Sequence, residues 1–336
     1  MASGRTPDGG RLKAGANASL RGSGQAEVIA SRDNRWLKEF RAALRGGVPT
    51  TSGAVGVEGV RLVEEALTSG CRVEAVLFGE SGERHRERLA PLIGRPEMGF
   101  PVLRTTDRLF EGVADTEHPQ GVAALVVPRK VEMEDLWTAP EGVCAPLIVV
   151  LTGVQDPGNV GTILRTAAAF GATGAVTAAT GQSGTASPYA PKALRASAGA
   201  ALHVPIVSGM ALGILLTQLK VRGIRTLASC VEEASENRNW KMQDGETQDP
   251  PFAEDAKGRP PIRADERALA PWEVDWCDAV ALLVGNEGAG LPVDVVRGAD
   301  ARVHIPMAGR VESLNAAAAA AVVLYEAFRQ RKKKRV

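Results

Sequence analysis

The residues best suited to chemistry begin at Asp156, in the segment DPGNVGTILRTA. Asp156 and Pro157 favour the start of a helix, because aspartate accepts hydrogen bonds from the first free N–H groups and proline fits the first turn. Asn159 would then lie at the amino end of this helix, where backbone N–H groups and the helix dipole favour a phosphate. Arg165 follows roughly 9 Å along the axis at 1.5 Å per residue. A nucleotide could be held between Asn159 and Arg165.

The apolar residues of this segment form one stripe of the expected helix. They are expected to face the core: Val160, Ile163, Leu164, Ala167 and Gly171. Thr162 and Arg165 would then point away from it. Taken singly, a surface asparagine and a surface arginine need no function, so their assignment depends on the wider pattern.

Two glycine-rich segments near the C-terminus have the form of ligand-binding loops, LLVGNEGAGLP at 282–292 and IPMAGRVESLN at 305–315. Each begins as a short apolar run typical of a buried strand. Each then breaks into glycine, which lets the backbone turn sharply or approach a ligand closely. The first has the form G-x-x-G-x-G, so it is not the dinucleotide fingerprint, and no Gly-Lys-Ser/Thr follows to make a phosphate loop. A nicotinamide-dependent oxidoreductase is therefore disfavoured.

The three segments together resemble the signature segments of the SpoU/TrmH branch of the SPOUT RNA methyltransferases. Those signatures are D-P-x-N-x-G-x-x-x-R-T-A, G-N-E-G-x-G and I-P-M-x-G-x-V-x-S-L-N, in the order found here. The resemblance runs from about Ile29 to the C-terminus. It implies transfer of the methyl group of S-adenosyl-L-methionine to a ribose 2′-hydroxyl in RNA, with ribosomal RNA favoured over tRNA and no metal.

The resemblance also implies roles for individual residues. The catalytic neighbourhood would comprise Asn159, Arg165, Glu287, Ser313 and Asn315. Glu287 would orient Arg165 or the acceptor nucleotide, and Asn315 would hydrogen-bond the ligand or a loop. Ser313 could instead simply cap the final helix.

The cofactor would lie against backbone groups of four residues: Gly285, Ile305, Met307 and Leu314. The apolar members would shield the adenine. As isolated residues, Ile305, Met307 and Leu314 would be ordinary core.

The role of Arg165 has two interpretations. The family's motif arginine has been cast as the base that removes the hydroxyl proton. An arginine side chain is effectively always protonated, so we prefer the hypothesis that Arg165 stays charged. It would bind the adjacent phosphate and stabilise the developing 2′-oxyanion, while the proton leaves through phosphate or water.

A chain of 336 residues can form two domains with separate cores. Residues 1–27 lack a hydrophobic period and are predicted to be a disordered tail. Residues 28–130 alternate short strands and helices, which predicts a small α/β sandwich. The resemblance implies that this domain is similar to ribosomal protein L30e and recruits RNA. V-E-G at 57–59 and H-P-Q-G at 118–121 match its landmarks, although GGVPTT at 46–51 replaces a frequent Lys/Arg-rich stretch.

The remaining chain is divided as follows. Residues 131–145 are predicted to be a linker, and residues 146–330 a parallel α/β sheet whose first strand is apolar throughout. Residues 231–271 are polar and rich in proline, which predicts a disordered insertion. Residues 331–336 are a basic tail that is either merely solvated or grips RNA.

A knot and a dimer are expected from the resemblance alone. The family folds its last strands and helix into a deep trefoil knot, and it places acceptor and cofactor elements across the two-fold axis of a homodimer. The alanine run at 316–321 would allow close helix packing, although alanine also simply favours a helix.

Charge and cysteine content limit the cellular setting. The chain has 40 basic and 39 acidic residues, so RNA affinity must come from local patches. The four cysteines lie far apart, which argues against a metal site and for a reducing compartment. The sequence has neither a membrane-length apolar stretch nor a signal peptide, so we expect a cytoplasmic protein without membrane contact.

Two alternatives to an rRNA enzyme remain. One is a tRNA 2′-O-methyltransferase. The other is a non-catalytic RNA-binding or ribosome-assembly protein on the same fold, although such a scaffold would not need the five catalytic candidates together.

Overall fold

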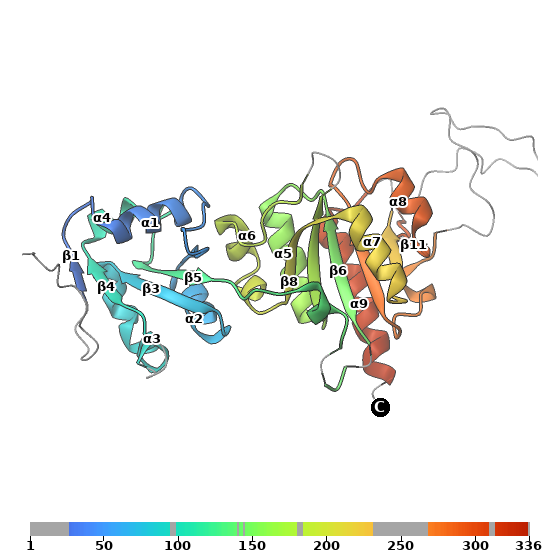
Figure 1. The fold of residues 1–336 in the computed structure, drawn as a ribbon, viewed down its shortest axis with the longest axis horizontal. Coiled ribbons are helices and arrows are strands. Elements are labelled where there is room, and N and C mark those ends of the chain that lie inside the picture. Colours follow the sequence, from blue (N-terminus) through green and yellow to red (C-terminus); the bar gives the residue numbers. More distant parts are fainter. Residues whose placement is uncertain are drawn as a thin grey trace, which may run out of the picture.

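The computed structural model describes residues 27–94, 99–139, 141–143, 145–179, 184–230, 268–308 and 313–334. Figure 1 shows two α/β units that follow one another along the chain and are joined after β5. The expected N-terminal tail up to residue 26, residues 231–267 of the expected insertion and residues 335–336 lie outside the described residues. So do residues 309–312 of the second glycine-rich segment.

The first unit contains a five-stranded sheet in the order β1-β4-β3-β5-β2. β1 and β3 pair with β4 in parallel, whereas β5 pairs antiparallel with β3 and β2. The strands span Glu27–Ile29 (β1), Val55–Glu58 (β2), Arg72–Phe78 (β3), Val102–Thr105 (β4) and Val122–Val127 (β5). The helices span Arg35–Leu44 (α1), Val60–Thr68 (α2), Arg86–Ile93 (α3) and Asp107–Glu111 (α4), with a 3-10 turn at Glu80–His85.

Alternation along β3 and β5 places helices on both faces of this sheet, because successive strand residues point to opposite sides. Ala75 and Leu77 of β3 pack with α1 and α4 in one buried cluster. Val76 and Phe78 belong to the cluster that holds α2 and α3. The predicted small α/β sandwich is therefore present as three layers.

The second unit contains a six-stranded sheet in the order β11-β9-β10-β6-β7-β8, and all of its strand pairs are parallel. The predicted parallel α/β sheet is thus confirmed. The strands span Leu147–Thr152 (β6), Gly174–Ala179 (β7), Ile206–Ala211 (β8), Arg225–Ser229 (β9), Val280–Val284 (β10) and Ala301–Val303 (β11). The helices span Pro157–Ala169 (α5), Pro191–Ala196 (α6), Leu212–Val221 (α7), Val293–Gly298 (α8) and Ala316–Lys334 (α9).

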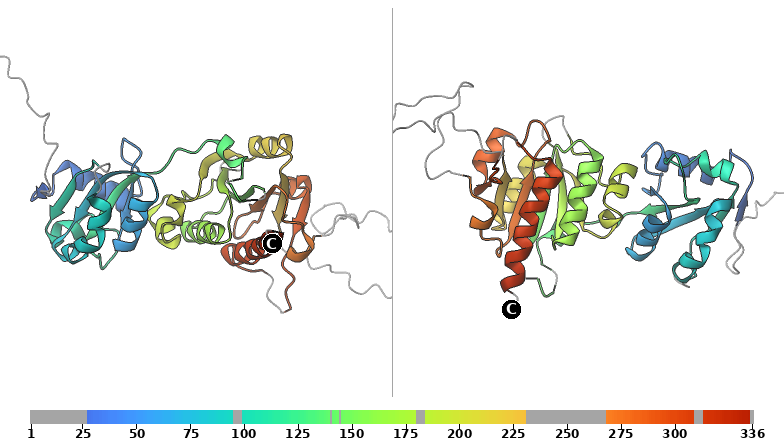
Figure 2. Two further views of the ribbon diagram at one scale, coloured as in Figure 1. Left: turned by 90° about the horizontal axis from the view of Figure 1, so that it is seen from below. Right: turned by 180° about the vertical axis from the view of Figure 1, so that it is seen from behind.

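Helices cover both faces of this sheet (Figure 2). α5 and α9 pack on one face, within the same buried cluster as Val149 of β6. α7 and α8 pack on the other face with Val150. All six residues of β6 are buried, which explains why its sequence is continuously apolar.

The alanine run of α9 begins at the first residue of the helix. Ala317 and Ala320 are buried, and α9 packs along α5. Beyond the end of α5, the Phe170 ring lies 5.6 Å from Tyr325 and 5.9 Å from Phe328, measured between ring centroids. The small side chains therefore face the core while aromatic rings fill the space beside them.

Three expected boundaries differ in the structure. Gly171 is not part of the buried stripe, because α5 ends at Ala169 and Gly171 is exposed with φ +76°, a helix-terminating conformation. Within the expected linker, Met133 and Leu136 are buried against the second sheet. At the end of the expected insertion, Leu269 forms a parallel bridge with Val303, so ordered structure resumes before residue 271.

Arg331 does not belong to a solvated basic tail. It lies in the last turns of α9 with a relative exposure of 6%. Its guanidinium donates hydrogen bonds to the carbonyl oxygens of Ala145, Pro146, Trp276 and Asp278 at 2.6 to 3.1 Å. It therefore ties the final helix to the chain just before β6 and β10 and cannot grip RNA.

None of the helices in the described ranges is both long and apolar enough to cross a lipid bilayer.

Candidate functional site

The expected site lies where the strand order of the second sheet reverses. β6 and β10 are neighbours, but the chain leaves β6 through α5 towards β7 and leaves β10 through α8 towards β11. In open parallel sheets, ligands bind outside the carboxyl ends of the strands at such a switch point. The loops that follow β6 and β10 therefore form the natural candidate site.

Glu287 joins these two loops through a set of hydrogen bonds. Its carboxylate accepts the Asn159 Nδ2 amide at 2.9 Å and the backbone N–H groups of Gln155 and Asp156, both at 3.3 Å. Asn159 and Glu287 were expected in one neighbourhood, and the structure brings them into contact. The Glu287 carboxylate therefore lies at the amino end of α5, where the positive end of the helix dipole favours a negative charge.

Asn315 adds the start of α9 to this network. Its Nδ2 donates to Asn159 Oδ1 at 3.1 Å, across a sequence separation of 156 residues. Its Oδ1 accepts the backbone N–H of Ala317 at 2.8 Å, so Asn315 caps the helix. The interpretation of Ser313 as the cap of the final helix is therefore wrong. We call Glu287, Asn159 and Asn315 the polar triad.

Asn286 closes the glycine-rich loop after β10, and sequence reasoning did not single it out. Its Oδ1 accepts the N–H groups of Gly288 and Ala289, both at 2.9 Å, and its Nδ2 donates to the Gly153 carbonyl at 2.8 Å. Asn286 also exchanges two backbone hydrogen bonds with Gly290. A side chain on Gly285 would collide with this returning backbone. An asparagine next to glycines is a turn signal that could have indicated this role.

Lys192, which was not among the predicted site residues, also lies beside the site. Its Nζ lies 2.6 Å from Asp156 Oδ1. Asp156 also accepts the Gly158 N–H at 3.1 Å, which confirms its predicted capping role. The Lys192 ammonium and the Gly158 N–H hold the pKa of the Asp156 carboxyl below its ordinary value. The first turn of α5 is therefore fixed in position both by Lys192 of α6 and by Glu287.

Arg165 does not join the polar triad within one copy of the chain. Its side chain is exposed, and no hydrogen bond or ion pair to it occurs in the described part of the chain. At 100° per residue, Arg165 lies about 120° around α5 from Asn159. The prediction that one nucleotide is held between these two residues stays a prediction.

Glu287 carries a pKa below its ordinary value. Partial burial acts to raise the pKa, but hydrogen bonds from Asn159 and from the N–H groups of Gln155 and Asp156 lower it by more. Glu287 is therefore a carboxylate at neutral pH and acts as a hydrogen-bond acceptor.

This lowered pKa predicts a pH-dependent difference between the wild-type protein and Glu287→Gln. A carboxyl whose pKa is lowered in the folded state contributes stability above its unfolded pKa, about 4.3, and loses it as the pH falls through the folded value. The wild-type Tm should exceed that of the variant by a few degrees at most, because water screens an exposed carboxylate. The difference should be constant from pH 8 to about 5 and shrink below that range. Thermal unfolding of both proteins from pH 8 to 3 measures it, and a pH-independent difference would contradict the ionised assignment.

The second unit of the chain matches a known protein family. The model of the SpoU rRNA Methylase family aligns with residues 146–325, the segment that contains the polar triad. The chain belongs to this family. Ahead of the SpoU segment, residues 50–124 match the MRM3-like substrate binding domain.

Individual SpoU relatives agree with the family model. The 23S rRNA (guanosine(2553)-2′-O)-methyltransferase RlmP of Bacillus subtilis is 28% identical over 88% of this chain and 97% of its own length. A 23S rRNA (guanosine-2′-O-)-methyltransferase RlmB of Xanthomonas campestris is 32% identical over 69% of this chain and 79% of its own. The crystal structure of an AdoMet-bound rRNA methyltransferase from Sinorhizobium meliloti superposes with a TM-score of 0.68 at 27% identity, over 91% and 98% of the two chains. The expected family and α/β fold are thus confirmed.

The residues at the expected cofactor site of this SpoU protein fit an adenosyl ligand. Gly285 directly follows β10, and Ile305 and Met307 follow β11 as half-buried side chains. Leu314 is 41% exposed, so it is not ordinary core. At the same edge of the sheet, the buried Thr152 hydroxyl has no hydrogen-bond partner among the described residues. Accessible apolar side chains suit an adenine, and a buried unpaired hydroxyl suits a polar ligand group.

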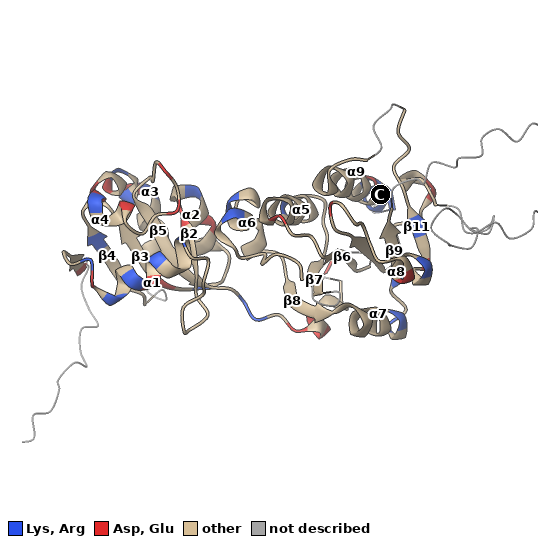
Figure 3. Ribbon diagram, turned by 90° about the horizontal axis from the view of Figure 1, so that it is seen from above, with Lys and Arg blue, Asp and Glu red and all other residues tan. Residues whose placement is uncertain are grey.

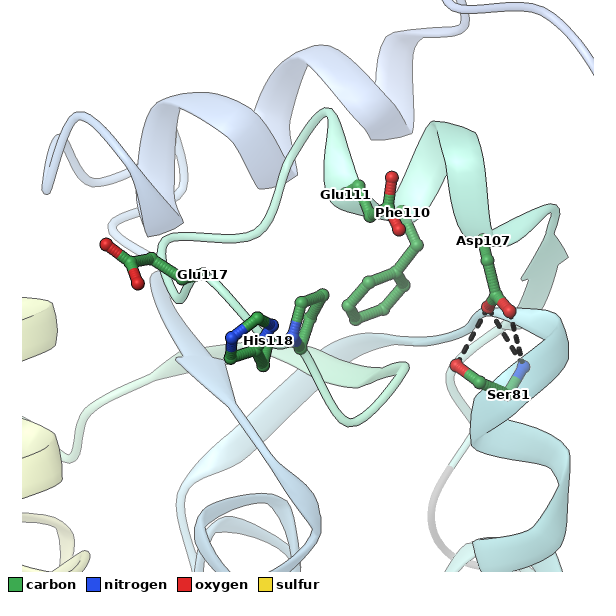
Figure 4. Close-up of a pocket in the computed structure, with 7 residues that line it drawn as sticks. Ser81, Asp107, Phe110, Glu111, Glu117 and His118 are labelled. Carbon is green, nitrogen blue, oxygen red and sulfur yellow. Dashed lines mark hydrogen bonds between the residues drawn. The ribbon is translucent and has the colours of Figure 1, made fainter.

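A separate pocket of about 290 Å³ lies in the first unit and does not suit RNA (Figure 4). Three carboxylate side chains line it, those of Asp107, Glu111 and Glu117, together with His118. Asp107 accepts hydrogen bonds from the backbone N–H and the hydroxyl of Ser81. Because the lining is acidic, this pocket would repel phosphate.

Among the described residues, no cluster of histidine, cysteine or carboxylate groups could hold a metal ion.

Proposed function

We propose that this protein transfers the methyl group of S-adenosyl-L-methionine to a ribose 2′-hydroxyl of RNA, and that its substrate is large-subunit ribosomal RNA. The observation that carries the proposal is the polar triad, which joins the three signature segments at the switch point of a SpoU sheet. The names of the RlmP and RlmB relatives, both 23S rRNA 2′-O-methyltransferases, support the substrate. The match to a substrate binding domain favours rRNA over tRNA.

The acceptor oxygen must lose its proton as it attacks, because a neutral hydroxyl is a poor nucleophile. S-adenosylmethionine supplies an electrophilic methyl group when it is bound. Arg165, kept as a cation, would bind the neighbouring phosphate and stabilise the developing 2′-oxyanion, while the proton leaves to phosphate or water. Asn159, Glu287, Ser313 and Asn315 would position the acceptor nucleotide.

The cofactor would be held by Gly285, Ile305, Met307 and Leu314. The partly exposed apolar side chains of Ile305, Met307 and Leu314 support this assignment. Such side chains would shield the adenine and exclude water from the sulfonium. Glu287 would remain a hydrogen-bond acceptor, since its lowered pKa makes it a weak base.

A homodimer would complete the site. Val322 and Tyr325 on the outer face of α9 are 44% and 53% exposed, which is unusual for large apolar side chains and suits an interface. Because Arg165 lies away from the polar triad of its own chain, the partner copy would bring its Arg165 to that triad. We further propose that the last strands and α9 form the trefoil knot expected of this family.

The cellular setting follows from the proposed substrate. Ribosomal RNA is modified where ribosomes are assembled, so we place the protein in the cytoplasm without a membrane partner. RNA would reach the site through local basic side chains, because the formal net charge of the chain is +1.

Methylation of purified RNA tests the proposed function. The protein would be incubated with labelled S-adenosylmethionine and unmodified 23S rRNA, 16S rRNA or tRNA, and the methylated ribose would then be mapped. We expect label at one nucleotide of 23S rRNA and saturable cofactor binding. Label in tRNA alone would refute the substrate class. Cofactor and RNA binding without any label would instead indicate a non-catalytic scaffold.

A further inference from the structure

Helix α6 and the turn after it lie between the two units of the chain (Figure 3). An ion pair and a side-chain hydrogen bond cross this boundary. Arg195 of α6 lies 2.7 Å from Asp115, and His203 Nε2 lies 2.8 Å from Glu65 of α2. Arg129, at the end of the first unit, also donates to the His203 carbonyl oxygen at 2.7 Å. We call Arg195, Asp115, Glu65 and His203 the interdomain clasp.

The packing around α6 leaves little room for movement. Gly161 of α5 lies so close to α6 that a side chain there would collide with the Ala193 carbonyl oxygen. On the other side, a Cβ on Gly199, whose φ is +86°, would come within 2.7 Å of the Glu65 Cβ. Leu62 of α2 and Leu194 of α6 belong to one continuous buried cluster. The boundary therefore resembles a core and not a loose hinge.

The first unit presents Asp115 from a braced loop. Arg41 of α1 and Arg45, the residue after α1, donate to the carbonyl oxygens of Gly112 and Ala114 at 3.0 and 2.6 Å, respectively. The Glu58 carboxylate accepts the Asp115 N–H at 2.8 Å, and Glu58 is only 8% exposed. Asp115 is therefore rigidly attached to the sheet of the substrate-binding unit.

In the second unit, the residue that pairs with Asp115 is Arg195 of α6, which lies close to the polar triad. Lys192 precedes Arg195 by one helical turn and pairs with Asp156. The Asp156 N–H, in turn, donates to Glu287. A short series of direct contacts thus runs from the substrate-binding unit through α6 to the first turn of α5.

We propose that the interdomain clasp sets a fixed distance between the first unit, which matches a substrate binding domain, and the methyl-transfer site, and so determines which nucleotide is methylated. Neighbouring nucleotides in one strand of duplex DNA rise by only about 3.4 Å. The spacing in an RNA helix is of the same order, so a small tilt of the first unit would present a different ribose. The four clasp residues are positioning residues in this scheme. This inference rests on the proposed function.

Charge reversal and its repair provide the variants. Asp115→Arg places a second cation beside Arg195, and Arg195→Asp places a second carboxylate beside Asp115. The double variant restores an ion pair in which the two charges have exchanged positions. Glu64→Gln is the matched control, because Glu64 neighbours Glu65 on α2 but pairs with Arg88 inside the first unit. Each full-length variant is compared for cofactor binding, for domain arrangement by small-angle X-ray scattering, and for methylation.

Methylation is measured on a full 23S rRNA transcript and on the shortest fragment of it that the wild-type protein modifies. A misplacement of about 1 Å can cost about a hundredfold in rate, so Asp115→Arg should lose about that factor in kcat/KM on the transcript. Part of its label should move to neighbouring nucleotides, while cofactor Kd and activity on the short fragment change little. The double variant should regain most of the transcript activity, and Glu64→Gln should match the wild type.

Two outcomes would overturn the inference. One is unchanged transcript activity and label position in both single variants. The other is an equal loss on both RNAs without recovery in the double variant, which would show a merely structural role. Wild-type protein that methylates no RNA would refute the proposed function and the selection role with it, whereas scattering would still show whether the clasp holds the two units.

Discussion

Replacement of Arg165 by alanine should lower kcat for RNA methylation by about a hundredfold to a thousandfold, the usual cost of removing a group that stabilises developing negative charge. Binding of S-adenosylmethionine should be unchanged, because Arg165 is exposed on α5 and is not one of the expected cofactor residues. Single-turnover methylation and cofactor titration measure the two quantities. Arg297→Ala is the matched control, because α8 covers the opposite face of the sheet.

Arg165→Lys separates the two chemical roles. If the cation stabilises the oxyanion, lysine should retain part of the lost rate. Equal losses in Arg165→Lys and Arg165→Ala at every pH, with normal RNA binding, would contradict simple charge stabilisation. Base chemistry or the forked geometry of the guanidinium would then be required.

Mixing two inactive variants tests whether Arg165 acts across subunits. In a closed two-fold dimer, Arg165→Ala and Glu287→Ala would form a heterodimer in which one site combines an intact Glu287 with the partner copy's intact Arg165. Random exchange should restore about a quarter of wild-type activity. No recovery in a mixture that demonstrably exchanges subunits would place both residues in the same chain's site.

Replacement of Arg331 by methionine should lower the free energy of unfolding by about 3 kcal/mol, because each buried carbonyl left without a donor costs about 1 to 3 kcal/mol. The substitution removes the charged donor from four carbonyl oxygens that lie at the starts of β6 and β10. Buried carbonyls left without donors keep their full desolvation cost. Chemical denaturation of the wild type and the variant measures the difference.

Two further variants make the Arg331 prediction specific. Lysine carries the charge but cannot reach four carbonyls with a planar fork, so Arg331→Lys should recover only part of the loss. Lys333→Met removes an exposed neighbouring cation of α9 and should change stability by about 0.5 kcal/mol or less. An Arg331→Met protein as stable as the wild type would refute the anchoring role.

The local features of this protein could be predicted from sequence because they depend on neighbouring residues. The Asp156 cap and the first proline of α5 follow from the chemistry of a helix start, and they are found as expected. β6 was recognisable because a strand buried on both faces must be apolar throughout. Glycine clusters indicated where the backbone turns.

Ser313 and Asn315 show the limit of such reasoning. Both residue types favour a helix cap, and a capping role for Ser313 was one interpretation of the sequence. The cap is Asn315, whose amide can bond the Ala317 N–H and Asn159 at the same time. A choice between two suitable residues is decided by which of them also meets a distant partner.

The sequence by itself determined the family, the alternation of strands and helices, and the residue types of the candidate site. Only the tertiary structure decided that Arg331 is buried, that Lys192 reaches Asp156, and that α6 joins the two units. The physical reason is that an arginine or lysine has the same local sequence signal in water and in a core. Its role is set by carbonyls and carboxylates that the fold brings from far along the chain.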